Sequence, residues 1–312
     1  MMQLRIGTRG SRLALIQTGT VAGLLKAKAG IDSVPVVIKT AGDIDQGRPL
    51  FGMGGKGIFE KEIDAAVLNG EVDMAVHSTK DLPTSMDGGL VIAAVPERAA
   101  ANDVLISRGG TMLEDLKEKS VIGTSSLLRI AELRHMRDDL RVKSIRGNVE
   151  TRIAKLDRGD YDAILLAEAG VRRLGLGGRI TQVLPLGDFP PAAGQGALAV
   201  VAAEENAEVM MALRELNDRN AMAEVTAERA ATGTLGGGCE ASVASIARAE
   251  GGSLTLSCSV FSVDPKKVLT ASLTGAADSA EELGIKAGND LASRGAGRVM
   301  DEWRVREKGA YE

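Results

Sequence analysis

Near its start the chain reads Leu4-Arg5-Ile6-Gly7-Thr8-Arg9-Gly10-Ser11, and the same plan returns as Ser120-Val121-Ile122-Gly123-Thr124-Ser125-Ser126. Each copy predicts a short strand, a Gly-Thr turn that contains serine, and a helix that begins just after the turn. Such a turn points backbone N–H groups and a hydroxyl at an anion near a helix N-terminus. The repeat therefore indicates two related strand–turn–helix units.

A second repeat follows each of these units in the same order. A helix predicted over 59–68 leads through a glycine turn to the strand Val72-Asp73-Met74-Ala75-Val76. A helix predicted over 149–156 leads in the same way to Tyr161-Asp162-Ala163-Ile164-Leu165-Leu166. Because strands that alternate with helices are typical of mostly parallel sheets, we expect an α/β fold with two similar lobes and a cleft between them.

The last third of the chain has a different pattern. Residues 253–260 alternate between polar and apolar side chains and predict a half-buried strand, and residues 268–273 predict its partner across the turn signal Asp264-Pro265. A helix predicted over 280–292 closes the chain. We expect a small α+β domain that carries Cys239 near its start.

Composition excludes several classes of protein. The chain has 312 residues, 44% of them hydrophobic and 26% charged, which is typical of globular proteins with more than one domain. A net charge of −4 and only 2% aromatic residues argue against a nucleic-acid or anionic-membrane binder. The sequence shows neither a signal peptide nor an apolar run that could span a bilayer, and it has no metal-ligand spacing of Cys and His. With two cysteines, we expect a cytoplasmic protein without a metal.

Cys239 lies at the end of the glycine-rich run Thr234-Leu235-Gly236-Gly237-Gly238-Cys239. Consecutive glycines let a large group approach the sulfur, and a thiolate is a strong nucleophile, so this cysteine suits covalent attachment. The alternative is a buried cysteine after a flexible turn. The second cysteine, Cys258, lies in the alternating strand and is expected to be a core residue.

Cationic side chains recur at the ends of predicted strands and the starts of predicted helices. They are Arg9, Arg12, Lys80, Arg129, Arg146, Arg152, Arg172 and Arg173, together with Lys56 in a glycine-rich stretch. Guanidinium groups bind carboxylates through two parallel hydrogen bonds, so the set suits a ligand with many carboxylates. A phosphorylated ligand would fit almost as well, and any one of these arginines alone could be a solvated surface residue.

Several longer motifs together resemble the porphobilinogen deaminase (hydroxymethylbilane synthase) family over essentially the whole chain. They are Ile6–Ala14, Gly54–Gly57, Val76–Pro83, Ile122–Ser126, Arg146–Val149, Tyr161–Ala167, Gly194–Ala197, Thr226–Ala230 and the Gly-Gly-Cys element at Cys239. The match is densest through residue 200.

The resemblance implies an α/β fold with two lobes like type II periplasmic binding proteins plus a C-terminal α+β domain. The implied boundaries are residues 1–96 with 197–216 for the first lobe, 97–196 for the second and 217–312 for the third domain. It also implies a dipyrromethane cofactor held by a thioether to Cys239, onto which four porphobilinogens condense with loss of ammonia before hydroxymethylbilane is released. A monomer of tetrapyrrole and haem biosynthesis is implied, with no nucleic-acid or membrane partner.

The same resemblance assigns roles to individual residues. Asp81 is the implied catalytic carboxylate, and Lys56 is the implied charge of a mobile loop over the cleft. The implied cofactor- and substrate-binding residues are Arg9, Ser11, Lys56, Ser78, Lys80, Thr124, Ser126, Arg129, Arg146, Asn148, Arg152, Arg173 and Gln195.

The chain departs from the family pattern at three places. Leu128 stands where the family usually has the first of two arginines, which predicts one cationic contact fewer with the bound chain. Gly52 replaces a frequent lysine, and Glu240-Ala241-Ser242 follows the cysteine where a Val-Pro pair is common.

Two other functions remain open from the sequence. A two-lobed module that closes on a carboxylated ligand explains the lobes and the arginines but gives no role to Cys239 or Asp81. An acyl-transfer enzyme with Cys239 as nucleophile needs a histidine partner, and both histidines fall in other regions. We expect His77 to pack at a strand end and His135 to be a surface helix residue.

Overall fold

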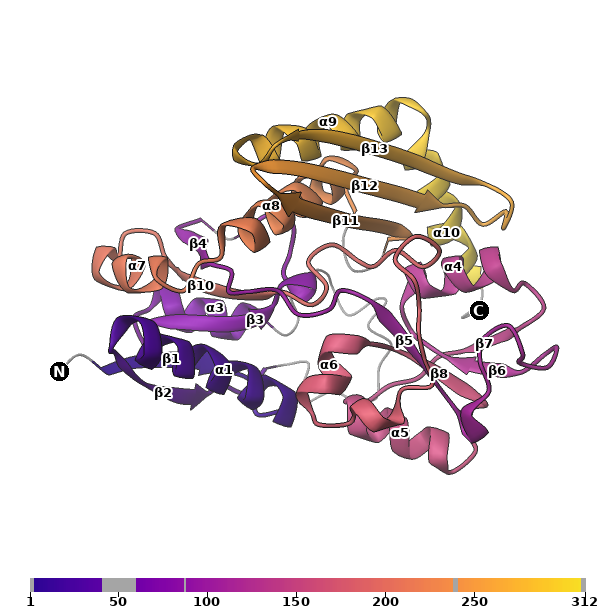
Figure 1. Cartoon of the computed structure of the whole chain (residues 1–312), viewed down its shortest axis with the longest axis horizontal. Helices are drawn as coiled ribbons and strands as arrows, with labels where there is room; N and C mark the ends of the chain where they lie inside the picture. Colours follow the sequence, from indigo (N-terminus) through magenta and orange to yellow (C-terminus); the bar gives the residue numbers. More distant parts are fainter. Residues whose placement is uncertain (1–2, 41–59, 87, 238–240, 310–312) are drawn as a thin grey trace. The chain divides into compact units, whose positions relative to one another are not determined.

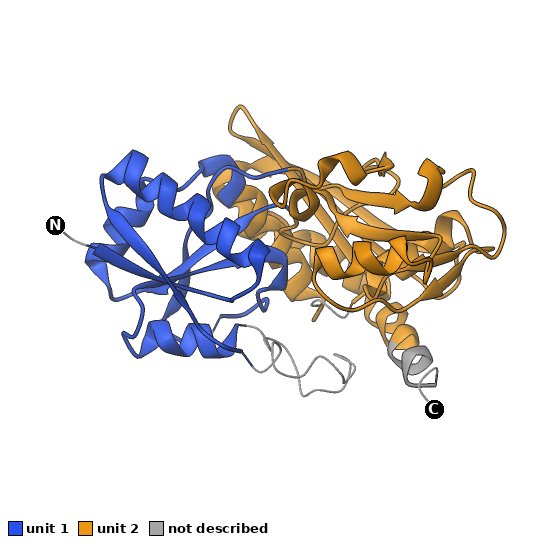
Figure 2. Cartoon of the chain, turned by 90° about the horizontal axis from the view of Figure 1, so that it is seen from below, with its two compact units in different colours: residues 1–99, 196–222 blue, residues 100–195, 223–312 orange. Residues whose placement is uncertain are grey.

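The computed structural model describes residues 3–40, 60–86, 88–237 and 241–309, with side chains through Trp303. The chain divides into two compact units, residues 1–99 with 196–222 and residues 100–195 with 223–312 (Figure 2). Several positions with sequence-based predictions lie outside the described residues: Gly52, the motif Gly54–Gly57 with Lys56, residue 59 of the predicted helix 59–68, Cys239 and Glu240. What the sequence predicts for them therefore stays a prediction.

The first unit is built on a five-stranded sheet in the order β2-β1-β3-β10-β4 (Figure 1). Strand β1 pairs in parallel with β2 and β3, whereas β10 pairs antiparallel with β3 and β4. The elements of this unit are β1 (Gln3–Thr8), α1 (Arg12–Leu24), a π-helical turn (Leu25–Ala29), β2 (Asp32–Val37), α3 (Lys61–Leu68), β3 (Met74–Ser78), a 3₁₀ turn (Thr79–Asp81), β4 (Leu90–Ala94), β10 (Leu198–Ala203) and α7 (Ala207–Arg214).

The second unit begins with a sheet of the same plan, in the order β7-β6-β8-β5-β9. Strand β6 pairs in parallel with β7 and β8, whereas β5 pairs antiparallel with β8 and β9. The elements are β5 (Asp103–Ser107), a 3₁₀ turn (Arg108–Gly110), β6 (Val121–Gly123), α4 (Leu127–Met136), β7 (Arg141–Lys143), α5 (Val149–Asp157), β8 (Ala163–Ala167), α6 (Glu168–Arg173), a 3₁₀ turn (Gly177–Arg179) and β9 (Gln182–Val183).

The two sheets confirm the predicted repeat of strand, Gly-Thr turn and helix. The expectation of mostly parallel sheets is wrong, because each sheet has two parallel and two antiparallel pairings. A parallel neighbour needs a crossover connection. Strand β5 is the first strand after the chain leaves the first unit, and β10 is the first strand after the chain returns to it. Neither strand is therefore joined to a neighbour in its sheet by the strand–helix–strand crossover that would make the pair parallel.

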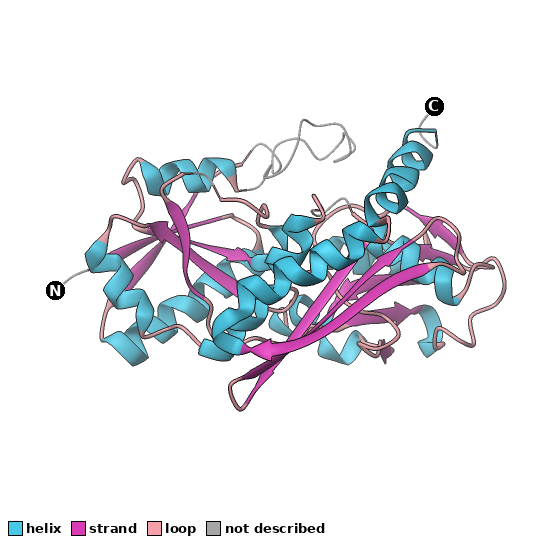
Figure 3. Cartoon of the chain, turned by 90° about the horizontal axis from the view of Figure 1, so that it is seen from above, coloured by secondary structure: helices cyan, strands magenta, loops and turns pink. Residues whose placement is uncertain are grey.

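The C-terminal part of the second unit is a three-stranded antiparallel sheet, β11-β12-β13, whose apolar side packs with α8 and α9 (Figures 1 and 3). Its elements are α8 (Arg219–Thr234), β11 (Val243–Glu250), β12 (Ser253–Phe261), β13 (Val268–Ala276), a 3₁₀ turn (Ala277–Ser279), α9 (Ala280–Ser293) and α10 (Ala296–Gly309). The alternation of residues 253–260 correctly predicted β12, and the expected partner over 268–273 is confirmed as β13, which pairs with it. The helix predicted over 280–292 is confirmed as α9, but the expectation that it closes the chain is wrong, because α10 follows after a short turn at Gly295.

Helix α8 lies unusually close to α9. A Cβ atom at Gly284 would collide with the carbonyl oxygen of Ala227, and one at Gly288 would lie 2.6 Å from Cβ of Thr234. The absence of a side chain at these two glycines therefore lets the α9 backbone rest directly on α8.

An apolar cluster joins helix α4 of the second unit to its C-terminal sheet. Leu127, Leu128 and Ala131 pack with Phe261 and Trp303. The indole N–H of Trp303 donates to the carbonyl of Phe261 at 2.8 Å. The α4 helix and the C-terminal part therefore share one core, and the three-domain boundaries implied by the family resemblance stay a prediction.

Candidate functional site

In the first unit, the turn after β1 is fixed by its own hydroxyl groups. Ser11 caps helix α1, and its Oγ accepts a hydrogen bond from the backbone N–H of Ala14 at 3.3 Å. A Cβ atom at Gly7 would meet Ile63 at 3.0 Å, so only glycine fits without displacing its neighbours. Arg9, which is half-buried, lies in this turn. The predicted binding residues Arg9 and Ser11 thus lie next to each other at a helix N-terminus.

The end of β3 lies beside this turn because β1 and β3 are parallel neighbours, with Gly7 opposite Ala75. The amide of Gln17 on α1 donates to Oγ of Ser78 at 2.9 Å, which joins the first helix to the end of β3. The chain then makes a 3₁₀ turn over Thr79–Asp81, on which Lys80 is half-buried and Asp81 is exposed. The structure therefore brings five predicted residues to the carboxyl ends of two neighbouring strands, β1 and β3: Arg9, Ser11, Ser78, Lys80 and Asp81.

His77 lies on the same strand but is buried in the interior. Its Nε2 is 3.2 Å from Oδ1 of Asp64 on α3, and both side chains are buried. This agrees with the expectation that His77 packs at the end of a strand. Gln17 and Asp64, which partner two predicted residues, were not identified from the sequence.

In the second unit, the equivalent turn after β6 has the same construction. Oγ1 of Thr124 accepts from the N–H of Ser126 at 3.2 Å, and Oγ of Ser126 caps α4 by accepting from the N–H of Arg129 at 3.5 Å. Ser125 binds the backbone of Ile145 with both its donor and its acceptor, at 2.8 and 3.0 Å. The turns after β6 and β7 are therefore held together.

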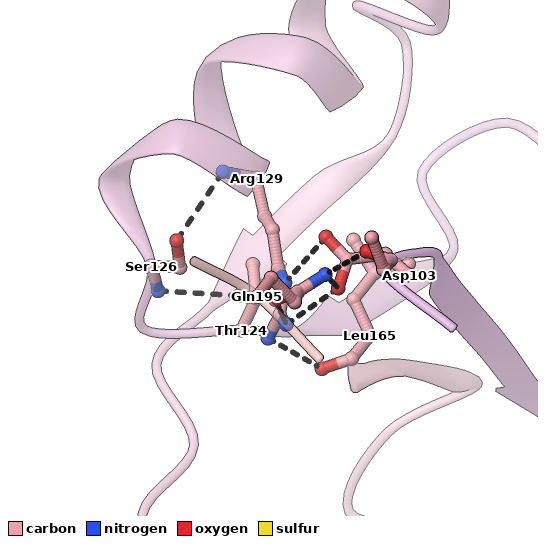
Figure 4. Close-up of polar contacts among 7 residues, drawn as sticks. Asp103, Thr124, Ser126, Arg129, Leu165 and Gln195 are labelled. Atoms are coloured by element: carbon pink, nitrogen blue, oxygen red, sulfur yellow. Dashed lines mark hydrogen bonds and ion pairs between the residues drawn. The ribbon is translucent and has the colours of Figure 1, made fainter. Parts of the chain in front are cut away.

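Arg129 lies at the centre of a buried polar network in this unit (Figure 4). Its Nε and Nη2 donate to the two carboxylate oxygens of Asp103 at 3.0 and 2.6 Å, and its Nη1 donates to the carbonyl of Leu165 at 3.3 Å. Gln195 completes the network, because its Nε2 donates to Asp103 at 2.8 Å and to the carbonyl of Ala101 at 2.7 Å. Four predicted binding residues therefore belong to one connected network: Thr124, Ser126, Arg129 and Gln195.

Asp103 changes the interpretation of Arg129. A bidentate carboxylate neutralises the guanidinium charge, so negative charge on a ligand has to be met mainly by other cations. The sequence offered one signal for this residue that we did not use: a charged side chain opens the buried strand Asp103–Ser107. The binding role of Arg129 stays a prediction.

The remaining predicted residues of this unit lie near two other helices. Asn148 caps α5, and its Oδ1 accepts from the N–H of Thr151 at 2.8 Å. Arg152 donates from Nε to the carbonyl of Gly147 at 2.8 Å, so it covers the turn that also contains Arg146. Arg173 ends α6, where burial lowers the pKa of its guanidinium.

Glu132 is a buried acid that was not identified from the sequence. Its side chain lies on the buried face of α4, one turn beyond Leu128, and is 0% exposed. Among the described residues, neither carboxylate oxygen has a hydrogen-bond partner. Burial, reinforced by the charge of Asp103 and opposed by Arg129, raises the pKa of Glu132 well above 4.5. This carboxyl therefore keeps its proton to a higher pH in the folded protein than in the unfolded chain.

Replacing Glu132 with Gln should remove a pH dependence of stability. Because the folded state raises the pKa, the unfolded chain loses this proton first, and the free energy of unfolding falls as pH rises from about 4.5 through the folded-state pKa. Glu132→Gln should therefore match the wild type near pH 4 and exceed its stability near pH 8. Urea unfolding at both pH values measures this, and a wild type that is more stable than the variant at pH 8 contradicts it.

Leu128, the departure from the family pattern, is 4% exposed and packs against Phe261 and Trp303. The resemblance predicts one cationic contact fewer at this position, and that stays a prediction. The structure gives the leucine side chain a packing role between α4 and the C-terminal sheet.

Leu128→Arg should therefore destabilise the protein without raising its activity. Truncating such a buried leucine to Ala costs about 2–5 kcal/mol, and a charge in the same place adds a desolvation cost. Leu15→Arg is the control, because Leu15 is 39% exposed and surface changes usually stay within about 0.5 kcal/mol. Urea unfolding compares the two, and a Leu128→Arg variant as stable as the control contradicts the packing role.

Cys258 is confirmed as a core residue. Its side chain is buried on β12, and its Sγ lies 3.3 Å from Oγ of Ser245. Burial raises the pKa of this thiol to about 11, so it is protonated at neutral pH and a poor nucleophile.

His135 is confirmed as a surface residue of α4, and its Nδ1 lies 2.5 Å from the carbonyl oxygen of Pro265. In the described part of the chain, no helix has the length and apolar character needed to cross a membrane.

Comparison with known proteins identifies the class to which this fold and these turns belong. The family model described as porphobilinogen deaminase, dipyromethane cofactor binding domain, matches residues 4–211. The model of the porphobilinogen deaminase C-terminal domain matches residues 222–293. The chain belongs to the porphobilinogen deaminase family.

Curated relatives agree over nearly the full length. The probable porphobilinogen deaminase of Nitrosopumilus maritimus is 44% identical over 97% of this chain and 97% of its own. The porphobilinogen deaminase of Syntrophobacter fumaroxidans is 41% identical over 96% of this chain and 97% of its own. Among solved structures, a substrate binding domain of a putative amino acid ABC transporter from Streptococcus pneumoniae covers 69% of this chain and 92% of its own, with 14% identity and a TM-score of 0.43.

Proposed function

We propose that this chain is a hydroxymethylbilane synthase that condenses four porphobilinogen molecules in turn onto a dipyrromethane primer. Family membership makes it a transferase of tetrapyrrole biosynthesis. The observation that supports the chemistry best is the position of Asp81, exposed at the end of β3 beside the turn of Arg9 and Ser11. A carboxylate beside cationic and hydroxyl donors suits a substrate that carries two carboxylates and develops positive charge when it loses ammonia.

The donor groups of the chain fit a dipyrromethane group. Two linked porphobilinogen units carry four carboxylates, and guanidinium groups and helix N-termini are the usual partners of carboxylates. Capped helix N-termini at Ser11, Ser126 and Asn148 would offer backbone N–H groups. The cations that would hold the group are Arg9, Lys80, Arg146, Arg152 and Arg173, with Arg129 as a neutralised donor. When bound, dipyrromethane supplies the terminal pyrrole carbon to which each new unit is joined.

Asp81 would act at the substrate that enters. Loss of ammonia from the aminomethyl group of porphobilinogen leaves a cation stabilised by the pyrrole nitrogen. A fixed carboxylate near that N–H stabilises the developing charge and can assist proton transfer. One such contact in a site that excludes water is worth about 3 kcal/mol.

Cys239 would anchor the cofactor through a thioether. Cys258 is a poor alternative, because its thiol is buried and protonated, which leaves Cys239 as the cysteine suited to this role. A monomer in the cytoplasm, with Lys56 as a further cation for the bound chain, completes the proposal as the family resemblance implied it.

Release of ammonia from porphobilinogen tests this function. The purified chain should release one ammonia for each porphobilinogen consumed and form one hydroxymethylbilane from four. A two-lobed binding module would take up porphobilinogen without releasing ammonia, and that result would overturn the proposal.

An acyl-transfer enzyme with Cys239 as nucleophile is disfavoured, because both imidazoles have other neighbours. His77 lies beside Asp64, and His135 lies beside the carbonyl of Pro265.

A further inference from the structure

Glu228 on helix α8 is a carboxylate with no exposed surface. Its Oε2 accepts a hydrogen bond from the backbone N–H of Gly194 at 2.7 Å, and its Oε1 accepts one from the N–H of Ala247 on β11 at 2.7 Å. One buried side chain therefore joins three segments that are far apart in sequence. Charge-assisted hydrogen bonds of this kind are about twice as strong as neutral ones.

The turn held by Glu228 leads directly into the polar network. Gly194 has φ +73°, a conformation that favours glycine, and the next residue is Gln195, which binds Asp103. The other end of the turn is also tied to β11, because the N–H of Ser245 donates to the carbonyl of Pro191 at 2.9 Å. Glu228 thus holds the residue immediately before Gln195, and Gln195 supports the Asp103–Arg129 pair.

The same helix leads to the proposed cofactor cysteine. Helix α8 ends at Thr234, five residues before Cys239 in the sequence. We infer that Glu228 is a positioning residue. It attaches the turn that carries Gln195 to helix α8, and through Gln195 it fixes the Arg129–Asp103 pair. Helix α8 is also the helix that precedes the proposed cofactor cysteine in the sequence. This inference rests on the proposed function for its effect on turnover, but its structural part can be measured separately.

Glu224 provides a matched control on the same helix. It lies one turn before Glu228, is buried, and accepts from the N–H of Ala249 on β11 at 3.1 Å. If Glu228 only attached α8 to β11, Glu224→Gln and Glu228→Gln should have similar effects. If Glu228 acts through the turn, only its own variant should disturb Gln195.

The experiment compares the full-length, cofactor-loaded wild type with Glu228→Gln and Glu224→Gln. Amide hydrogen exchange should become faster in the peptide over residues 191–195 for Glu228→Gln alone. Loss of one charge-assisted hydrogen bond predicts a kcat for porphobilinogen about tenfold lower in that variant. Combining it with Gln195→Met should give no more than the larger of the two single effects, because both act on the same pair.

Each outcome decides the inference. Equal exchange and equal kcat in the two glutamine variants, or fully additive effects with Gln195→Met, would overturn it. If Glu228→Gln does not fold, Glu228→Asp replaces it, because the shorter carboxylate keeps the charge but cannot reach both amides, and unchanged exchange in that variant overturns the inference. A wild type that releases no ammonia contradicts the proposed function, while the exchange result at residues 191–195 still tests Glu228.

Discussion

Replacing Asp81 with Asn should lower the turnover of porphobilinogen by about 10²- to 10³-fold, the usual effect of removing one group that stabilises charge in the transition state. The amide keeps the size of the side chain but loses the negative charge that, in the proposed function, stabilises the cation formed when ammonia leaves. Because Asp81 is exposed on its 3₁₀ turn, the variant should fold normally and retain the cofactor that we propose is attached to Cys239. Ammonia release and intact mass together measure the two properties.

Asp115→Asn is the matched control for this result, because Asp115 is also exposed but lies in the loop before β6. It should leave turnover unchanged. An Asp81→Asn variant with at least a third of wild-type turnover would show that another group supplies the catalytic charge.

The second large effect concerns the stability of the second unit. Arg129→Met leaves the carboxylate of Asp103 buried without its cation, and breaking a buried ion pair on one side costs about 3–5 kcal/mol. Removing both charges with Arg129→Met and Asp103→Leu together should recover most of this loss, since apolar replacements of buried pairs are often neutral. Urea unfolding of the single and double variants measures the difference.

Arg179→Met is the control for this prediction, because its pair with Asp157 is solvent-exposed on both sides and such pairs contribute about 0–1 kcal/mol. The double variant also separates two roles of Arg129. If it is stable but binds the cofactor poorly, Arg129 contacts the bound chain as the family resemblance implies. A single variant as stable as the control would contradict the structural role.

Local features of the fold were predictable from the sequence because they depend on neighbouring residues. The Gly-Thr turns after β1 and β6 combine a glycine that has no space for a Cβ with a serine that caps the next helix, and both signals lie within a few residues. The alternation of β12 was equally visible, because its buried and exposed side chains follow a period of two.

Long-range features were not predictable in the same way. The Asp103–Arg129 and Glu228–Gly194 contacts join residues 26 and 34 positions apart, and no local pattern pairs them. Leu128 has an apolar packing role that becomes visible only once Phe261 and Trp303 are placed beside it. Strands β5 and β10 pair antiparallel with their neighbours because of the path that the chain takes between the two units. The periodicity of side chains within one strand carries no information about that path.

The intact mass of the purified chain tests whether Cys239 anchors a dipyrromethane group. We expect a mass increase equal to two linked pyrrole units in the wild type and in Cys258→Ala, and none in Cys239→Ala. A chain isolated without the group should acquire it when porphobilinogen is added. An unmodified mass after that addition, or an adduct that persists in Cys239→Ala, would contradict the assignment of Cys239 as the cofactor anchor.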